Sequence, residues 1–158
     1  MATIYKAPED SFLPNDEGLL RVFLAGSIDM GKAENWQQRL ECELADLDVV
    51  ICNPRRDDWD SSWVQSIDNP QFNEQVTWEL ENIEAAHLVV FYFDPNGQAP
   101  ITLLELGLAL NSGPKVIICC PDGYWRKGNI EMVCDRYDLP LHNNIDDFIK
   151  SIKEYIEG

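Results

Sequence analysis

The sequence predicts a doubly wound α/β domain with about five parallel strands and helices on both faces of the sheet. Two observations support this prediction. Short apolar runs alternate with segments of helical periodicity along most of the 158 residues. Each run is apolar throughout, which is typical of strands buried on both faces of a parallel sheet. Right-handed crossovers between such strands give a flavodoxin- or Rossmann-like architecture.

The predicted strands begin at residue 21, after an N-terminal arm over 1–20 that is expected to be loose. They are expected at 21–26, 48–54, 87–94 and 115–121, and the apolar run at 139–141 supplies a short fifth strand. Each of the four longer runs is followed by polar or turn-forming residues. We therefore expect one α/β domain over 21–158.

The predicted helices lie between these strands and at the end of the chain, at 33–44, 71–86, 102–113, 128–136 and 145–156. Apolar residues three or four positions apart predict which face of a helix packs on the sheet. For the first helix these residues are Trp36, Leu40 and Leu44. For the second helix they are Phe72, Val76, Leu80 and Ile83.

The chain is strongly acidic, with 28 acidic and 12 basic residues and a net charge of −16. This charge repels phosphate backbones and anionic lipids, so neither a nucleic-acid polymer nor a membrane is an expected partner. A small ligand in a pocket remains compatible with it. No apolar run approaches the length of about 18 residues that a membrane span needs. The N-terminus also lacks the apolar core of a secretion signal, so we expect a cytoplasmic protein.

Five cysteines are present, and no two of them form a CxxC pair. Cys52, Cys119 and Cys120 fall in predicted strands, which indicates buried thiols in a reducing compartment. The two histidines, His87 and His142, are far apart in the sequence. We therefore expect no metal and no cofactor.

The residues just beyond the predicted strands are the candidates for a site, because ligands of such sheets bind at the carboxyl ends of the strands. Gly26 and Ser27 lie at the end of the first strand. Because glycine has no side chain, its backbone there is accessible, and together with the serine hydroxyl it could hold an anion or a sugar hydroxyl. After the second strand, Arg55 could hold a phosphate, and Asp57 and Trp59 could face a base. A turn at the first position and a solvated loop with local ion pairs at the second are the simpler alternatives.

Two carboxylates follow the third strand. Asp94 precedes Pro95 and is either a turn residue or a site residue. Glu105 lies in the apolar run "PITLLELGLAL", where an unpaired charge is costly to bury. One explanation is a capping box in "TLLE", in which Thr102 and Glu105 each satisfy a backbone N–H. The other is catalytic, because two carboxylates around one sugar carbon suit glycosyl transfer through an oxocarbenium-like transition state.

Several motifs in this order resemble the nucleoside 2-deoxyribosyltransferase family, over roughly residues 21 to 120. They are "VFLAGSI", "NWQ", "NPRRDDWD", "QVTWE", "FYFDP" and "TLLELGLAL". Within this family, the motifs resemble most specifically the bacterial branch that carries the LLELG and NPRR signatures. It implies cleavage of the N-glycosidic bond of a 2′-deoxynucleoside by a glutamate nucleophile, with transfer of the sugar to a second base. The partners would then be small-molecule nucleosides and nucleobases.

The resemblance assigns the nucleophile to Glu105 and a contact with the base or sugar to Asp94. It also implies a homo-oligomer in which a late segment of one subunit approaches the pocket of another. The family often has a tyrosine in the first loop, where this chain has Ile28 and Asp29. The other residues that we expect to bind substrate are Gly26, Ser27, Asp29, Trp36, Arg55, Asp57, Trp59, Trp78 and Thr102.

Three alternatives remain open at this point. The first is hydrolysis of (deoxy)nucleosides or their 5′-monophosphates, with water in place of the second base. The second is a non-catalytic nucleotide-binding protein that kept the pocket. The third concerns the tryptophans, each of which either forms a dry wall of the site or packs in the core.

Overall fold

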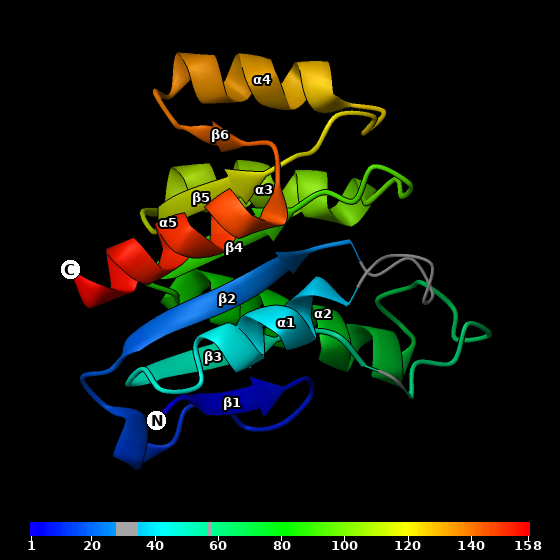
Figure 1. The fold of residues 1–158 in the computed structure, drawn as a ribbon. Coiled ribbons are helices and arrows are strands. Elements are labelled where there is room, and N and C mark those ends of the chain that lie inside the picture. Colours follow the sequence, from blue (N-terminus) through cyan, green and yellow to red (C-terminus); the bar gives the residue numbers. More distant parts are fainter. Residues whose placement is uncertain (28–34, 57) are drawn as a thin grey trace.

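The computed structural model describes residues 1–27, 35–56 and 58–158. Within them, six parallel strands form one open sheet in the order β1-β3-β2-β4-β5-β6, and helices cover both faces (Figure 1). The strands are Thr3–Lys6 (β1), Leu20–Gly26 (β2), Val49–Asn53 (β3), Leu88–Tyr92 (β4), Lys115–Cys119 (β5) and Leu141–His142 (β6). The doubly wound fold is confirmed, with one strand more than expected.

Two layers of helices enclose the sheet. The helices are Trp36–Glu43 (α1), Pro70–Ala85 (α2), Pro100–Ser112 (α3), Lys127–Arg136 (α4) and Ile145–Glu157 (α5). Helices α2, α3 and α4 pack on the face that carries Phe23 and Phe91. Helices α1 and α5 pack on the opposite face, which carries Leu24 and Val90. Burial of such side chains contributes about 1.5–3 kcal/mol each, so the two central strands β2 and β4 hold the layers together.

The additional strand, β1, comes from the arm that was predicted to be loose. It pairs in parallel with β3, with Tyr5 opposite Cys52 and Lys6 opposite Asn53. Tyr5 is buried, whereas Ile4 is exposed, because an edge strand turns alternate side chains outward. With a single buried side chain in four residues, this strand lacks the continuous apolar run by which we identified the others.

The inward face of α2 also differs from the prediction. Ile83 is buried as expected, but Leu80 is 39% exposed. The buried positions are instead occupied by Gln75, Trp78 and Asn82. Helix α2 therefore presents polar side chains to the interior, which an analysis of hydrophobic periodicity does not predict.

Cys52, Cys119 and Cys120 are buried, as the sequence predicted. Cys134 is buried as well, and Cys42 of α1 is exposed. Burial raises the pKa of Cys52 to about 11 and that of Cys119 and Cys120 to about 12. In the part of the chain that the structure describes, no helix has the length and apolar character needed to cross a membrane.

Candidate active site

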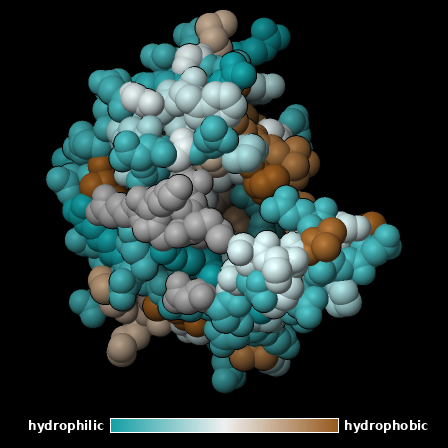
Figure 2. Space-filling view, turned by 90° about the vertical axis from the view of Figure 1, so that its right-hand side faces the viewer, coloured by the Kyte–Doolittle hydropathy of each residue, from teal (hydrophilic) through white to brown (hydrophobic). Residues whose placement is uncertain are grey.

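The sheet has its reversal point between β2 and β4. From β2 the chain continues to β3 on one side, and β4 then lies on the other side of β2. Ligands of doubly wound sheets bind beyond the carboxyl ends of the strands at such a point. Figure 2 looks onto this edge of the molecule and shows it hollowed beside the grey atoms. Residues that lie near the ends of β2 and β4 are therefore the ones that can line a ligand site.

The tip of β2 is fixed by close contacts that require a glycine. A Cβ on Gly26 would lie 2.5 Å from the Trp36 ring and 2.5 Å from the Tyr92 carbonyl oxygen. The next residue, Ser27, donates its backbone N–H to the Tyr92 carbonyl at 3.0 Å. Its hydroxyl oxygen accepts the backbone N–H of Asp94 at 2.9 Å. Ser27 thus joins the ends of β2 and β4, and its hydroxyl is already engaged by the protein.

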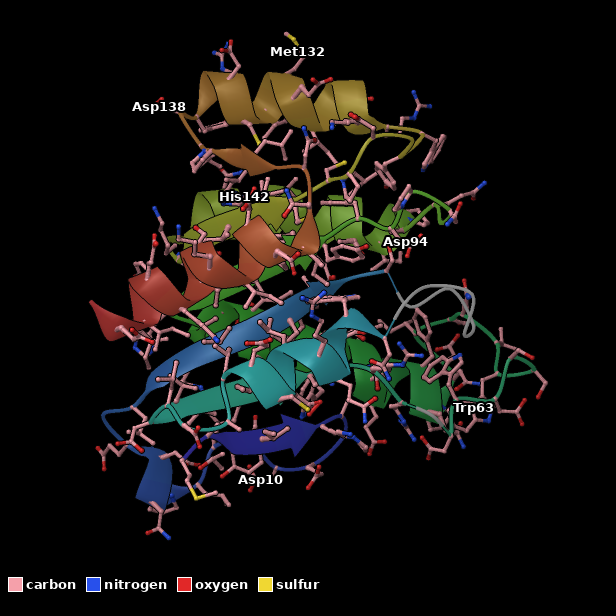
Figure 3. The ribbon with its side chains drawn as sticks, in the orientation of Figure 1. Asp10, Trp63, Asp94, Met132, Asp138 and His142 are labelled. Carbon is pink, nitrogen blue, oxygen red and sulfur yellow. The ribbon has the colours of Figure 1, made fainter. Side chains whose placement is uncertain are left out.

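Asp94 lies at the same edge, two residues beyond the end of β4, and is 5% exposed (Figure 3). Its Oδ1 accepts the backbone N–H of Asn96 at 2.8 Å, and its carbonyl accepts the N–H of Gly97 at 3.0 Å. These bonds match the turn alternative. The structure therefore brings Asp94 together with Gly26 and Ser27.

The long loop after β3 lies at this edge as well, and Trp63 marks its position in Figure 3. Trp59 and Trp63 pack edge to face, with their ring centroids 4.8 Å apart. The Arg56 guanidinium lies 5.8 Å and 5.4 Å from these two rings, and Arg56 pairs with Asp58 at 3.2 Å. Both tryptophans are partly buried. Arg56 thus stabilises the loop through a local ion pair, as the simpler alternative for this segment predicted.

Arg55 points toward the tip of β2. Its Nη1 donates to Gln37 Oε1 at 3.3 Å, and Gln37 Nε2 donates to the Ser27 carbonyl at 3.5 Å. Gln37 is fully buried. The structure therefore places Arg55, the predicted phosphate-binding residue, beside the same strand end as Ser27.

The tryptophans Trp36 and Trp78 lie in the core. Trp36 is 1% exposed, packs against Tyr92 and Phe148, and donates its indole N–H to the Ser27 carbonyl at 3.1 Å. Trp78 is 7% exposed and packs against Phe23 on the opposite face of the sheet. This placement fits core packing. Trp36 supports the strand tip from behind.

Glu105 is not a helix cap. Helix α3 begins at Pro100, and its N-cap residue is Ala99, which makes no side-chain cap hydrogen bond. Thr102 and Glu105 are therefore inside the helix, and Glu105 lies in its second turn rather than the first. The signal for the true start is Pro100, because proline is favoured at the first helical position. The capping-box explanation of Glu105 was wrong.

The connection into α3 is strained. Ala99 has φ +46° and ψ 53°, a left-handed conformation that costs a residue with a Cβ about 1–2 kcal/mol. The preceding carbonyl, that of Gln98, accepts hydrogen bonds from the Tyr124 hydroxyl and from the Trp125 indole at 2.9 Å. These contacts fix the point from which α3 starts and, with it, the position of Glu105.

Glu105 forms a hydrogen-bonded pair with Glu79, a residue that the sequence analysis did not select. Glu105 is 7% exposed, and Glu79 is partly buried on α2. Gln75 Nε2 donates to Glu79 Oε2 at 2.8 Å and to the Pro54 carbonyl, just beyond β3, at 2.9 Å. Glu79 thus connects the end of β3 to the centre of α3.

The pair is unfavourable in its doubly ionised form. Burial raises the pKa of Glu105 well above 4.5, and the charge and hydrogen bond of Glu79 raise it further. Burial also raises the pKa of Glu79, against the opposing effect of its hydrogen bonds to Gln75 and Glu105. The two carboxyl groups therefore retain a proton at pH values above the ordinary pKa of a glutamate.

Such a pair can supply one carboxylate as a nucleophile while the other holds the proton. The only sequence signal for Glu79 was its spacing from Gln75 and Asn82, four and three positions away, which places all three on one helix face.

Two predicted binding residues, Asp29 and Asp57, lie outside the described residues.

The family model described as "Nucleoside 2-deoxyribosyltransferase like" matches residues 19–124, more than half of the chain. The matched range contains Gly26, Glu79, Asp94 and Glu105. A search of curated proteins found no match.

Proposed function

Because the chain belongs to the nucleoside 2-deoxyribosyltransferase-like family, we propose that it cleaves the N-glycosidic bond of 2′-deoxynucleosides and transfers the deoxyribosyl group to another nucleobase. The observation that carries this proposal is the buried pair of Glu105 and Glu79. Glu79 lies on α2, which leads from β3 to β4, and Glu105 lies on α3, which follows β4. Glycosyl transfer with a covalent intermediate needs one carboxylate to attack the sugar carbon, and a pair with one proton provides it.

In the proposed reaction, the shared proton moves across the hydrogen bond to Glu79 and leaves Glu105 as the carboxylate. A Glu105 oxygen attacks the anomeric carbon, and the bond from that carbon to the base nitrogen breaks. The base leaves with the bonding electron pair and takes up a proton. A nitrogen of the second base then attacks the same carbon, the ester bond to Glu105 breaks, and the second base releases a proton. The exchange as a whole consumes no proton.

Asp94 has the second role in this proposal. It lies at the end of β4, linked through its backbone to Ser27 at the end of β2. From this position its carboxylate would hold the base or the sugar in line with Glu105. Arg55, directed to the same strand end, would bind a 5′-phosphate if the substrate carries one.

In a non-catalytic nucleotide-binding protein, helix capping could have explained Glu105. Ala99 is the N-cap of α3, so that explanation does not apply. A buried pair of acidic residues without a chemical role would only reduce stability, because burial and mutual repulsion disfavour its ionised forms. The pair is accordingly better explained by catalysis.

The reaction is tested by incubating the protein with each deoxynucleoside and each 5′-monophosphate, with and without a second free base. Chromatography of the products separates the outcomes. Exchanged nucleoside supports base transfer. Free base without exchange overturns the transfer step and supports hydrolysis, and no change with any substrate overturns the enzymatic proposal.

Replacement of Trp59 by alanine should raise KM more than it lowers kcat. The loop after β3 covers the base in this proposal, and loss of aromatic stacking on a base weakens binding about 5- to 150-fold. Such binding is common to the ground state and the transition state, so turnover should change little. The control is Tyr137→Ala, which removes an aromatic ring that is 51% exposed at the end of α4. An unchanged KM in the Trp59 variant would assign the loop a structural role.

We also propose that the protein is a homo-oligomer, with a second copy covering the outer face of α3. Ile101, Leu104 and Leu108 are 59%, 61% and 42% exposed and lie along one side of this helix. Within α3, which the structure describes from end to end, the only ionisable residue is Glu105, and it is buried. Two chains that each carry a charge of −16 repel one another, so a contact between them is favoured at an uncharged apolar face.

Leu104→Lys should dissociate this oligomer, because it places a charge in the centre of an apolar contact. Sedimentation at micromolar concentration should show a particle larger than the 18.1 kDa chain for the unmodified protein and a lighter one for the variant. Met132→Lys is the control, since Met132 is 71% exposed and lies on the neighbouring helix α4, at the top of Figure 3, outside the apolar side of α3. A fully active 18.1 kDa monomer of the unmodified protein would contradict the assembly.

A further inference from the structure

The N-terminal segment outside the family match makes contacts that reach the acidic pair. The matched range begins at residue 19, whereas β1 and the chain that follows it, residues 3–18, belong to the same compact fold. We refer to residues 3–18 as the N-terminal clamp. Ser11 of the clamp is 1% exposed, and Asp16 is 7% exposed. Two of its polar residues are thus buried against the rest of the domain.

The N-terminal clamp is attached to the sheet at its first end. β1 pairs with β3, and the N–H of Ala7 donates to the Asn53 carbonyl at 3.1 Å, at the end of β3. Figure 1 shows β1 at one edge of the sheet, next to β3. Beyond the clamp, Arg21 of β2 donates to the Ser11 carbonyl at 2.8 Å, and its guanidinium lies 4.6 Å from the Phe12 ring. The segment is consequently held at both ends.

Between these attachments the clamp makes two hydrogen bonds to α2. The Trp78 indole donates to the Glu9 carbonyl at 2.7 Å. The Ser11 hydroxyl donates to Asn82 Oδ1 at 2.7 Å, and the Asn82 amide donates to the Trp78 carbonyl at 2.8 Å. These contacts lie on either side of Glu79, which directly follows Trp78 and precedes Asn82 by three positions.

On its other side, Glu79 is held by Gln75, which also binds the Pro54 carbonyl. The end of β3 therefore contacts α2 one turn before Glu79, through Gln75. The clamp contacts α2 at Trp78, just before Glu79, and at Asn82, just after it. The position of a helix and its rotation about its axis are set by such contacts on both sides of a residue. A small rotation of α2 would move the Glu79 carboxyl away from α3.

We infer that the N-terminal clamp is a positioning element of the active site, which holds Glu79 against Glu105 through Trp78 and Asn82. Ser11 and Trp78 are then positioning residues for the acidic pair. This inference rests on the proposed function for its catalytic consequence, but the geometric claim can be tested without any activity.

The test is a pH titration of the two carboxyl groups, monitored by carboxyl ¹³C NMR of glutamate-labelled full-length protein. Ser11→Ala removes the hydroxyl, and Trp78→Phe removes the indole N–H but keeps an aromatic ring against Phe23. Release of α2 should separate the two carboxyls and admit water, so the titration midpoint of Glu105 should fall by about half a pH unit or more in both variants. Arg21 on β2 contacts Asn82, Arg56 after β3 pairs with Glu74, and α2 also carries Glu81 and Glu84; neither variant alters any of these charged groups.

Tyr5→Phe is the matched control. It removes the buried hydrogen bond between Tyr5 and Asp16, which joins two clamp residues and does not reach α2. This variant should unfold more easily while the Glu105 midpoint stays within about a tenth of a pH unit of that of the unmodified protein. Ser11→Ala decides the question alone if Trp78→Phe does not fold.

Two results would overturn the inference: an unchanged Glu105 midpoint in Ser11→Ala, or an equal shift in Tyr5→Phe, which would reflect general loosening. If the proposed function holds, the acidic limb of the kcat/KM profile should move with the NMR midpoint. If no substrate reacts, the proposed function fails, while the titration still decides whether the clamp positions the pair.

Discussion

Glu105→Gln should abolish turnover while it increases stability at neutral pH. An amide is a far poorer nucleophile than a carboxylate, so kcat should fall by at least about 1,000-fold. The covalent adduct of the sugar with the protein should also be missing from the mass spectrum. Because the two side chains have nearly the same shape, the fold should be retained.

The gain in stability follows from the linkage between protonation and folding. The pKa values of Glu105 and Glu79 are raised above 4.5 in the folded protein. Below pH 4.5 the folded and unfolded chains both hold these protons, so the pair is least unfavourable there. As the pH rises above 4.5, the unfolded chain releases protons that the folded chain retains, and stability falls until the raised pKa values are passed. Glu105→Gln removes the part of this loss that comes from Glu105.

Thermal unfolding should therefore show a higher midpoint for the Glu105→Gln variant at pH 8, and the difference should narrow toward pH 4.5. About 1 kcal/mol corresponds to 2–4 °C in a domain of this size. Glu84→Gln, which removes an equal charge from the exposed side of α2, is the control for the net charge. A Glu105→Gln variant that exchanges bases at the original rate would rule out Glu105 as the nucleophile.

Glu79→Gln should move the acidic limb of kcat/KM to lower pH. The charge of Glu79 and its hydrogen bond to Glu105 both raise the pKa of Glu105. Without that charge, Glu105 ionises at a lower pH, so the nucleophile remains available in more acidic solution. The maximum rate should also fall, because Glu79 no longer accepts the proton that Glu105 must lose.

The control for this experiment is Glu81→Gln, two positions along the same helix and exposed. Solvent screens the loss of that charge, so the limb should stay where it is. An equal shift in both variants would show that the net charge of the protein, and not the pair, sets the acidic limb.

The sequence was most informative about the interior of the sheet. The continuous apolar runs that contain Phe23, Ile51 and Phe91 predicted three central strands, since only strands buried on both faces are apolar at every position. β1 was missed because an edge strand needs a single buried side chain, and Tyr5 provides it. Its place in the sheet depends on pairing with β3, an interaction between distant parts of the chain.

The candidate site could be predicted only in part, for a related reason. Asp94 and Glu105 stand out because they interrupt or end apolar runs. Glu79 does not stand out, since "ELENIE" resembles the solvated face of any helix. Only the packing of α2 against α3 shows that this acid faces inward. The capping box at Thr102 was misleading because the pattern fits locally, while Pro100 starts the helix earlier.

The single exposed thiol makes the protein suitable for distance measurements. Cys42 is on the surface of α1, whereas burial raises the pKa of the other four cysteines and keeps them from forming the reactive thiolate. A nitroxide reagent should therefore label one position per chain without any cysteine being replaced. In a homo-oligomer, the dipolar coupling between these labels would then report the spacing and symmetry of the subunits directly in solution.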